Sequence, residues 1–107
     1  MKKMRYDICH DKWRFTVMSQ DDFIRKHKTD DEAMATFESY EVDIQEAHLT
    51  VETIKHELVH VHLNYCFLES ASGLSKADLE EIYCELFARR SDLISKQAKE
   101  IFKKLKG

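Results

Sequence analysis

The stretch from residue 50 to residue 68 restricts the fold more than any other part of the sequence. Its apolar residues recur at intervals of three and four, the spacing that places side chains on one face of an α-helix. Thr50 precedes this pattern and suits the N-cap position, where a hydroxyl accepts a hydrogen bond from a free backbone N–H. We therefore predict a helix over residues 50–68 that buries one side. The residues of this buried stripe are Val51, Ile54, Leu58, Val61 and Tyr65.

Shorter patterns before this helix predict a hairpin and a second helix. Apolar and polar residues partly alternate over residues 5–17, and the polar turn His10-Asp11-Lys12 divides them, which predicts a β-hairpin. Residues 19–22 read Ser-Gln-Asp-Asp and resemble a capping box. A short helix is therefore expected to begin there and to end near His27.

The next part of the chain predicts a connection followed by a strand. Residues 28–35 are mostly polar and are expected to form the connection. In residues 37–45, Tyr40, Val42 and Ile44 alternate with polar residues and would share one face of a strand. This strand either borders a cleft, where an extended peptide could add to its edge, or is internal with its apolar face in the core.

Helical patterning returns near residue 75 and, together with the strands, defines the fold class. Ser75-Lys-Ala-Asp78 resembles another capping box, and helix is expected from there to the C-terminus with a break near Ser91-Asp92. The chain has no proline and only two glycines, which favours helix over long irregular loops. We predict a single α+β domain over residues 1–107, with N-terminal antiparallel strands packed on the helix over residues 50–68 and on a C-terminal helix.

Charge and cysteine content argue against several classes of protein. The net charge is −3 with acidic and basic residues interspersed, whereas a nucleic-acid-binding protein normally carries a basic face. The three cysteines lack CxxC spacing, and no apolar stretch approaches the length of a membrane span. We expect a cytoplasmic protein that binds neither nucleic acid nor membrane. A lysine-rich C-terminal segment is interpreted as a solvated helix end, with an anionic partner as the alternative; its lysines are Lys96, Lys99, Lys103, Lys104 and Lys106.

The helix over residues 50–68 also carries a chemical motif, His56-Glu57-Leu-Val-His60. Residues four apart lie on one helix face, so both imidazoles can reach a single metal ion. Glu57 lies beside that face, where it can contact a metal-bound water, and the buried stripe is on the opposite side. The motif predicts a Zn²⁺ site with His56 and His60 as ligands and Glu57 as general base. The alternative is a pair of solvent-facing histidines on a core helix.

A catalytic zinc site usually needs a third protein ligand. Glu81 and Glu85 lie four residues apart on the next predicted helix, and small residues on the same face, Cys84 and Ala88, would allow close approach of the two helices. The alternative is that the two glutamates form the wet side of an amphipathic helix.

The HExxH motif and the glutamates of the following helix together resemble two groups of zinc peptidases. HExxH followed by a helix bearing Glu-x-x-x-Asp/Glu is similar to the gluzincin arrangement of thermolysin-type proteases. Residues 81–88 read Glu-Ile-Tyr-Cys-Glu-Leu-Phe-Ala, similar to the Glu-x-x-Ala-Asn-x-Phe-Ala segment of ImmA/IrrE-type metallopeptidases of bacteria and mobile elements. That group also places a β-strand before its HExxH helix. The resemblance implies a minimal zincin-like domain of phage or mobile-element origin, with Glu81 as third zinc ligand and Glu85 as the hydrogen-bond partner of His56.

Three functions follow as hypotheses. The first is an intracellular zinc endopeptidase acting on a peptide or protein, such as a regulatory protein, through a zinc-activated water and Glu57. The second is a non-catalytic zinc-binding interaction module on a zincin scaffold, and the third is an interaction protein in which the motif is accidental. A peptidase also needs a donor for the developing oxyanion. The candidates for that donor are Tyr40, His48, His62 and Tyr83.

Overall fold

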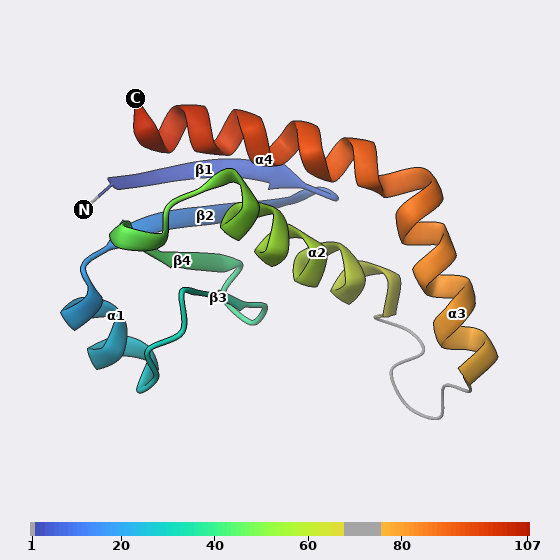
Figure 1. The fold of residues 1–107 in the computed structure, drawn as a ribbon, viewed down its shortest axis with the longest axis horizontal. Helices are drawn as coiled ribbons and strands as arrows, with labels where there is room; N and C mark the ends of the chain where they lie inside the picture. The colour runs from blue at the N-terminus through green and yellow to red at the C-terminus, as the bar shows by residue number, and fades with distance from the viewer. Residues whose placement is uncertain (1, 68–75) are drawn as a thin grey trace.

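The computed structural model describes residues 2–67 and 76–107 and has an α+β fold (Figure 1). Its four-stranded sheet has the order β1-β2-β4-β3; the outer pairs are antiparallel, and β2 and β4 are parallel. The α+β class is confirmed, but the expectation of purely antiparallel strands is wrong, because α1 and β3 separate β2 from β4 along the chain. In chain order the elements are β1 (Lys2–Ile8), β2 (Asp11–Met18), α1 (Gln20–His27), β3 (Ala33–Thr36), β4 (Glu41–Gln45), the 3-10 helix η1 (Glu46–His48), α2 (Val51–Phe67), α3 (Lys76–Glu85), the π-helix η2 (Leu86–Arg90) and α4 (Ser91–Lys106).

The predicted hairpin and two of the three predicted helix starts are present. The β1–β2 turn consists of Cys9 and His10, whose φ angles of 49° and 73° match a two-residue turn that follows strand twist. The Ser19 hydroxyl caps α1 by accepting from the Asp22 N–H at 3.2 Å. The Thr50 hydroxyl caps α2 in the same way, accepting from the Thr53 N–H at 3.1 Å.

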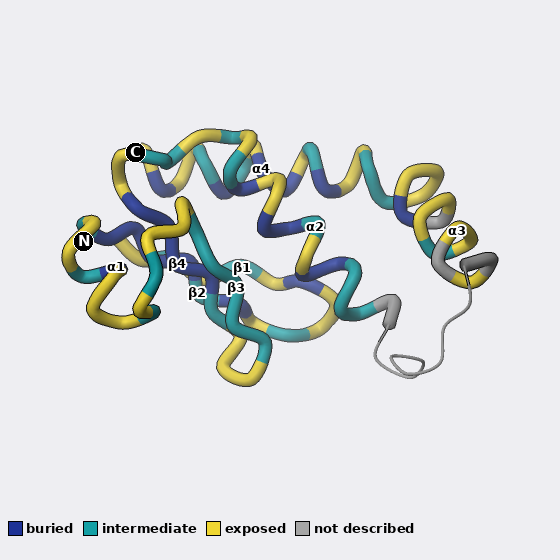
Figure 2. The backbone as a smooth tube through the Cα atoms, turned by 60° about the horizontal axis from the view of Figure 1, so that its bottom comes forward, coloured by how far each residue is buried: buried dark blue, intermediate teal, exposed yellow. Residues whose placement is uncertain are grey.

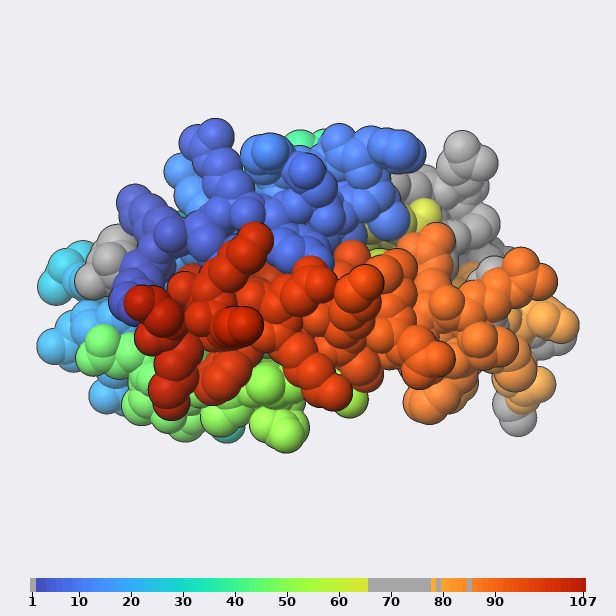
Figure 3. All heavy atoms as spheres, turned by 90° about the horizontal axis from the view of Figure 1, so that it is seen from above, coloured from blue at the N-terminus to red at the C-terminus, as the bar shows by residue number. Residues whose placement is uncertain are grey.

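The core lies between one face of the sheet and the helices α2 and α4. These helices pack against each other, α2 beside β3 and α4 beside β1. Seen from above, α4 lies between the β1–β2 hairpin and the residues near the start of α2 (Figure 3). The buried stripe predicted on α2 is confirmed at three positions, since Ile54, Leu58 and Val61 are fully buried. They pack with sheet residues that include Trp13, Phe15, Val17, Val42 and Ile44.

The strand expected over residues 37–45 is shorter, and a further strand precedes it. Residues 37–40 form a turn in which Tyr40 has a φ of 54°, so the strand is limited to β4. Residues 33–36, expected to be part of a connection, form β3 because they pair with β4. Their sequence, Ala-Met-Ala-Thr, has little intrinsic strand preference, so the pairing with β4 determines that they form a strand. The strand over residues 41–45 is therefore internal, and β3 is one of the two edge strands of the sheet.

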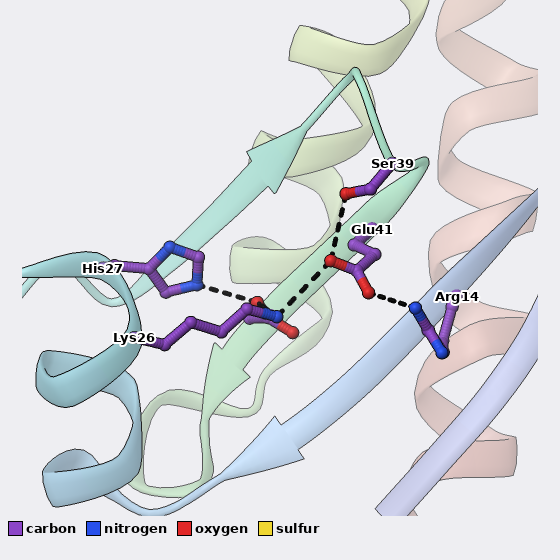
Figure 4. A network of polar contacts seen from close by, with 6 residues as sticks. Arg14, Lys26, His27, Ser39 and Glu41 are labelled. Atoms are coloured by element: carbon purple, nitrogen blue, oxygen red, sulfur yellow. Dashed lines mark hydrogen bonds and ion pairs between the residues drawn. The ribbon is translucent and has the colours of Figure 1, made fainter.

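The opposite face of the sheet holds a buried carboxylate. Asp43 on β4 is 1% exposed because α1 covers it. Lys26 Nζ and His27 Nε2 lie 2.8 Å and 2.7 Å from its Oδ2 atom. Figure 4 shows Lys26 and His27 directed from the end of α1 toward the sheet. These contacts from consecutive residues attach the end of α1 to the sheet, and a charge-assisted hydrogen bond offsets much of the cost of burying the carboxylate.

Neighbouring Glu41 belongs to the same network and makes stability depend on pH. Burial opposes its ionisation, but hydrogen bonds from Ser39, Arg14 and Lys26, with the charge of Lys26, outweigh burial and lower the pKa of Glu41. Because the folded-state pKa lies below the unfolded one, ionised Glu41 stabilises the fold at higher pH. That contribution is lost as the pH falls through the folded-state pKa.

We therefore expect the free energy of unfolding to fall less steeply for Glu41→Gln than for wild type on acidification below about pH 5. Urea unfolding at a series of pH values measures both slopes. Glu38→Gln, at an exposed position of the adjacent turn, is the control and should retain the wild-type slope. Equal slopes for wild type and Glu41→Gln would show that the network does not favour ionised Glu41.

The C-terminal helices leave the core at one end. The helical residues continue without a break at Ser91-Asp92, and the irregularity comes earlier, where the π-helix η2 separates α3 from α4. Figure 2 shows that the described residues of α3 are mainly exposed, whereas β2 and β4 are largely buried. The predicted turn at residues 70–73 and the capping Ser75 lie outside the described residues. None of the helices in the described part is both long and apolar enough to cross a membrane.

Candidate functional site

Helix α2 presents His56 and His60 on its exposed face. Their ring centroids are 4.9 Å apart and their planes make an angle of 73°. Both residues are exposed, while Ile54 and Leu58 on the other side of the helix are fully buried. The helix therefore has the two-sided character that its sequence predicts.

A cavity of about 440 Å³ lies between α2 and β3. Ala33 and Ala35 pair with Ile44 and Val42 of the core, so their methyl groups face the side of the sheet that α2 covers. Side chains this small leave space opposite the helix. The cavity is lined by Thr53, His56, Glu57 and His60 of α2, and by Asp31, Glu32, Ala33, Met34, Ala35 and Phe37 in and around β3.

Glu57 is held inside this cavity. It is only 6% exposed, and its carboxylate accepts a hydrogen bond from the backbone N–H of Ala35. Burial raises the pKa of Glu57, while the nearby His60 and His56 and the hydrogen bond from Ala35 act in the opposite direction. A carboxylate with a raised pKa accepts a proton more readily near neutral pH than an ordinary glutamate does.

The outer edge of β3 has backbone groups directed away from the sheet. The Gln45 N–H donates to the Glu32 carbonyl at 3.0 Å, so Glu32 bonds toward β4. In an antiparallel pair the bonding direction alternates, and the backbone groups of Ala33 and Ala35 therefore point to the other side. Within the described residues no strand pairs with that side. It borders the cavity, and its backbone groups other than the Ala35 N–H, which donates to Glu57, are open to a further extended segment.

The predicted third ligand is not brought to the histidines. Glu81 is exposed on α3, which continues beyond the end of α2, away from the cavity (Figure 1). In residues 2–67 and 76–107, no group of three or more His, Cys, Asp or Glu side chains is placed to hold a metal ion. The side chain of Glu85, the predicted partner of His56, lies outside the described residues. The roles of Glu81 and Glu85 stay predictions.

The four candidate oxyanion donors also lie elsewhere, as none of them lines the cavity. Tyr40 packs edge-on against Trp13, and His48 lies 3.6 Å from Glu32. Tyr83 is 60% exposed on α3. His62 is in the core, where burial lowers its pKa.

His62 has a structural environment rather than a catalytic one. Its Nε2 lies 2.9 Å from the Gln97 side-chain oxygen, and Arg90 donates to its Nδ1 at 3.1 Å. Arg90 therefore selects the tautomer that carries its proton on Nε2. These contacts connect α2 to the end of η2 and to the middle of α4.

Sequence reasoning missed the residues that β3 contributes. Ala35 holds Glu57 through its backbone, and Asp31 and Phe37 line the cavity. The available signal was the spacing Asp31, Ala33, Ala35 and Phe37, because residues two apart share a strand face. That signal is weak, since two of the four side chains are single methyl groups.

The chain matches no family model, and comparisons with curated proteins and with solved structures give no significant match. A fold of this class hosts many unrelated functions, whereas a site is recognised by the geometry and chemistry of its residues. The chemistry of this chain is therefore to be inferred from the cavity itself.

Proposed function

We propose that the protein is a zinc-dependent peptide hydrolase. The supporting observation is that an exposed histidine pair and a buried glutamate share one cavity with the free edge of β3. Each part matches one need of peptide hydrolysis: metal ligands, a general base, and a backbone edge that can bind an extended chain.

The donor chemistry of the cavity fits zinc. His56 and His60 provide imidazole nitrogens, which zinc prefers, and both side chains line the cavity. Glu81 is the candidate third ligand by sequence alone. When bound, the metal would supply Lewis-acid chemistry, polarising a carbonyl oxygen and lowering the pKa of water.

Glu57 would act as the base and then the acid. Its carboxylate would take a proton from the attacking water and pass it to the departing amine. The hydrogen bond from Ala35 limits the directions in which the carboxylate can turn. The backbone groups of Ala33 and the carbonyl of Ala35 would meanwhile pair with the substrate backbone and hold the peptide beside the base.

A non-catalytic zinc-binding module is the second candidate. Two observations favour it: Glu81 lies away from the histidines, and none of the four candidate oxyanion donors lines the cavity. This candidate shares the metal site with the first but predicts no hydrolysis of any peptide. If the motif is accidental, as in the third hypothesis, neither zinc binding nor peptide hydrolysis is expected.

Metal content tests the proposal first. We expect about one zinc per chain in untagged wild-type protein, with loss of zinc in His56→Ala and weaker binding in Glu81→Ala. Elemental analysis after purification without chelators measures the stoichiometry. His10→Asn is the matched control, since His10 is exposed in a left-handed turn position that asparagine tolerates.

A wild-type chain that is metal-free and does not take up added zinc would end the proposal. Zinc that persists in His56→Ala would place the metal elsewhere. If Glu81→Ala binds zinc as tightly as wild type, Glu81 is not a ligand.

A further inference from the structure

The cavity beside β3 has two chemically different ends. Ala33 and Ala35 share one face of β3, and Asp31 before the strand and Phe37 after it line the same cavity, so a carboxylate and an aromatic ring lie at opposite ends of two methyl groups. Glu57 is attached to this face at Ala35. A peptide along the edge would therefore meet an acidic end and an apolar end on either side of Glu57.

The acidic end is available to a ligand. Asp31 is exposed, and its carboxylate makes no hydrogen bond or ion pair with the described residues; only its backbone carbonyl is used, by the Gln45 side chain at 2.8 Å. Neighbouring Glu32 lies 3.6 Å from His48. No lysine or arginine among the described residues lines the cavity.

We propose that Asp31, assisted by Glu32, makes the cavity select peptides with a lysine or arginine side chain at this end and an apolar side chain at the Phe37 end. The inference rests on the proposed function, because it takes a peptide as the ligand. The physical basis is charge complementarity in a recess, which favours one sign of charge and disfavours the other.

Strand geometry gives the position of the basic residue. Successive residues in an extended chain advance by about 3.3 Å, so Asp31, two residues before Ala33, lies at most about 7 Å from the start of β3, within reach of an extended lysine. A peptide antiparallel to β3 runs from the Phe37 end toward the Asp31 end. The basic residue then lies on the C-terminal side of the bond beside Glu57, and the apolar residue on the N-terminal side.

Binding of two synthetic peptides tests this. Both carry the same fluorescent label and the same sequence, in which an apolar residue is followed by three alanines; the next residue is lysine in one peptide and glutamate in the other. This spacing places both side chains on the same side of an extended chain. Affinity is measured by fluorescence anisotropy in a Glu57→Gln background, so that the readout does not depend on turnover. We expect the lysine peptide to bind about tenfold more tightly, with the difference shrinking at high salt.

Two substitutions at Asp31 make the test specific. Asp31→Asn should remove most of the difference, and Asp31→Lys should reverse it. Asp21→Asn, which removes the same charge from an exposed position on α1, should leave the difference unchanged. Equal binding of the two peptides, no binding of either, or a lysine preference that survives Asp31→Lys would each overturn the inference.

The outcomes separate this inference from the proposed function. A charge preference in binding, with no hydrolysis by the wild-type chain, would keep the inference and remove the peptidase. Hydrolysis without any charge preference would keep the peptidase and remove the inference.

Discussion

We expect Glu57→Gln to hydrolyse peptides about 10²- to 10⁴-fold more slowly than wild type while retaining its zinc. Glutamine has the shape of glutamate, and its amide oxygen can still accept the hydrogen bond from Ala35. It cannot take up a proton, so proton transfer is the property that changes. The rate is measured on a library of quenched-fluorescent peptides, and zinc by elemental analysis of the same samples.

Stability provides a check on this result. Burial opposes the charge of Glu57 and raises its pKa, so a neutral isostere at this position should not unfold the chain. Thermal unfolding of both proteins verifies that point. Glu52→Gln, at an exposed position of the same helix, is the activity control. Hydrolysis by Glu57→Gln at the wild-type rate would contradict the role of Glu57 as the base.

The second large effect concerns Asp43 on the other face of the sheet. We expect Asp43→Ala to lower the free energy of unfolding by about 2–4 kcal/mol, because it removes the acceptor of two charge-assisted contacts. His27 is 7% exposed and would keep a ring nitrogen without its partner. Lys26 is 43% exposed and can turn toward water or toward Glu41, which limits the loss.

Urea unfolding of the single variants and of the double variant with His27→Ala measures the coupling between the two residues. Asp7→Asn is the control, since it removes an exposed ion pair, Asp7 to Lys12 at 3.3 Å, which should matter by less than about 1 kcal/mol. A similar loss in the control and in Asp43→Ala would mean that the buried network contributes nothing beyond a surface pair.

The helix that carries the candidate site could be predicted from its own residues. A helical period is a local property, so the spacing of Ile54 and Leu58 determined both the buried side of α2 and the exposed side that holds His56 and His60. The caps at Ser19 and Thr50 are equally local. The deep burial of Glu57 was not predictable in this way, because β3, more than twenty positions earlier in the chain, covers it.

By itself the sequence determined the α+β class, the hairpin, the caps and the two-sided helix, since each depends on residues within a few positions of one another. Only the tertiary structure decided that β4 is internal and β3 is an edge strand, that α1 buries Asp43, and that α3 carries Glu81 away from the histidines. Strand pairing and helix docking depend on contacts between distant segments, whose free energies no short pattern records.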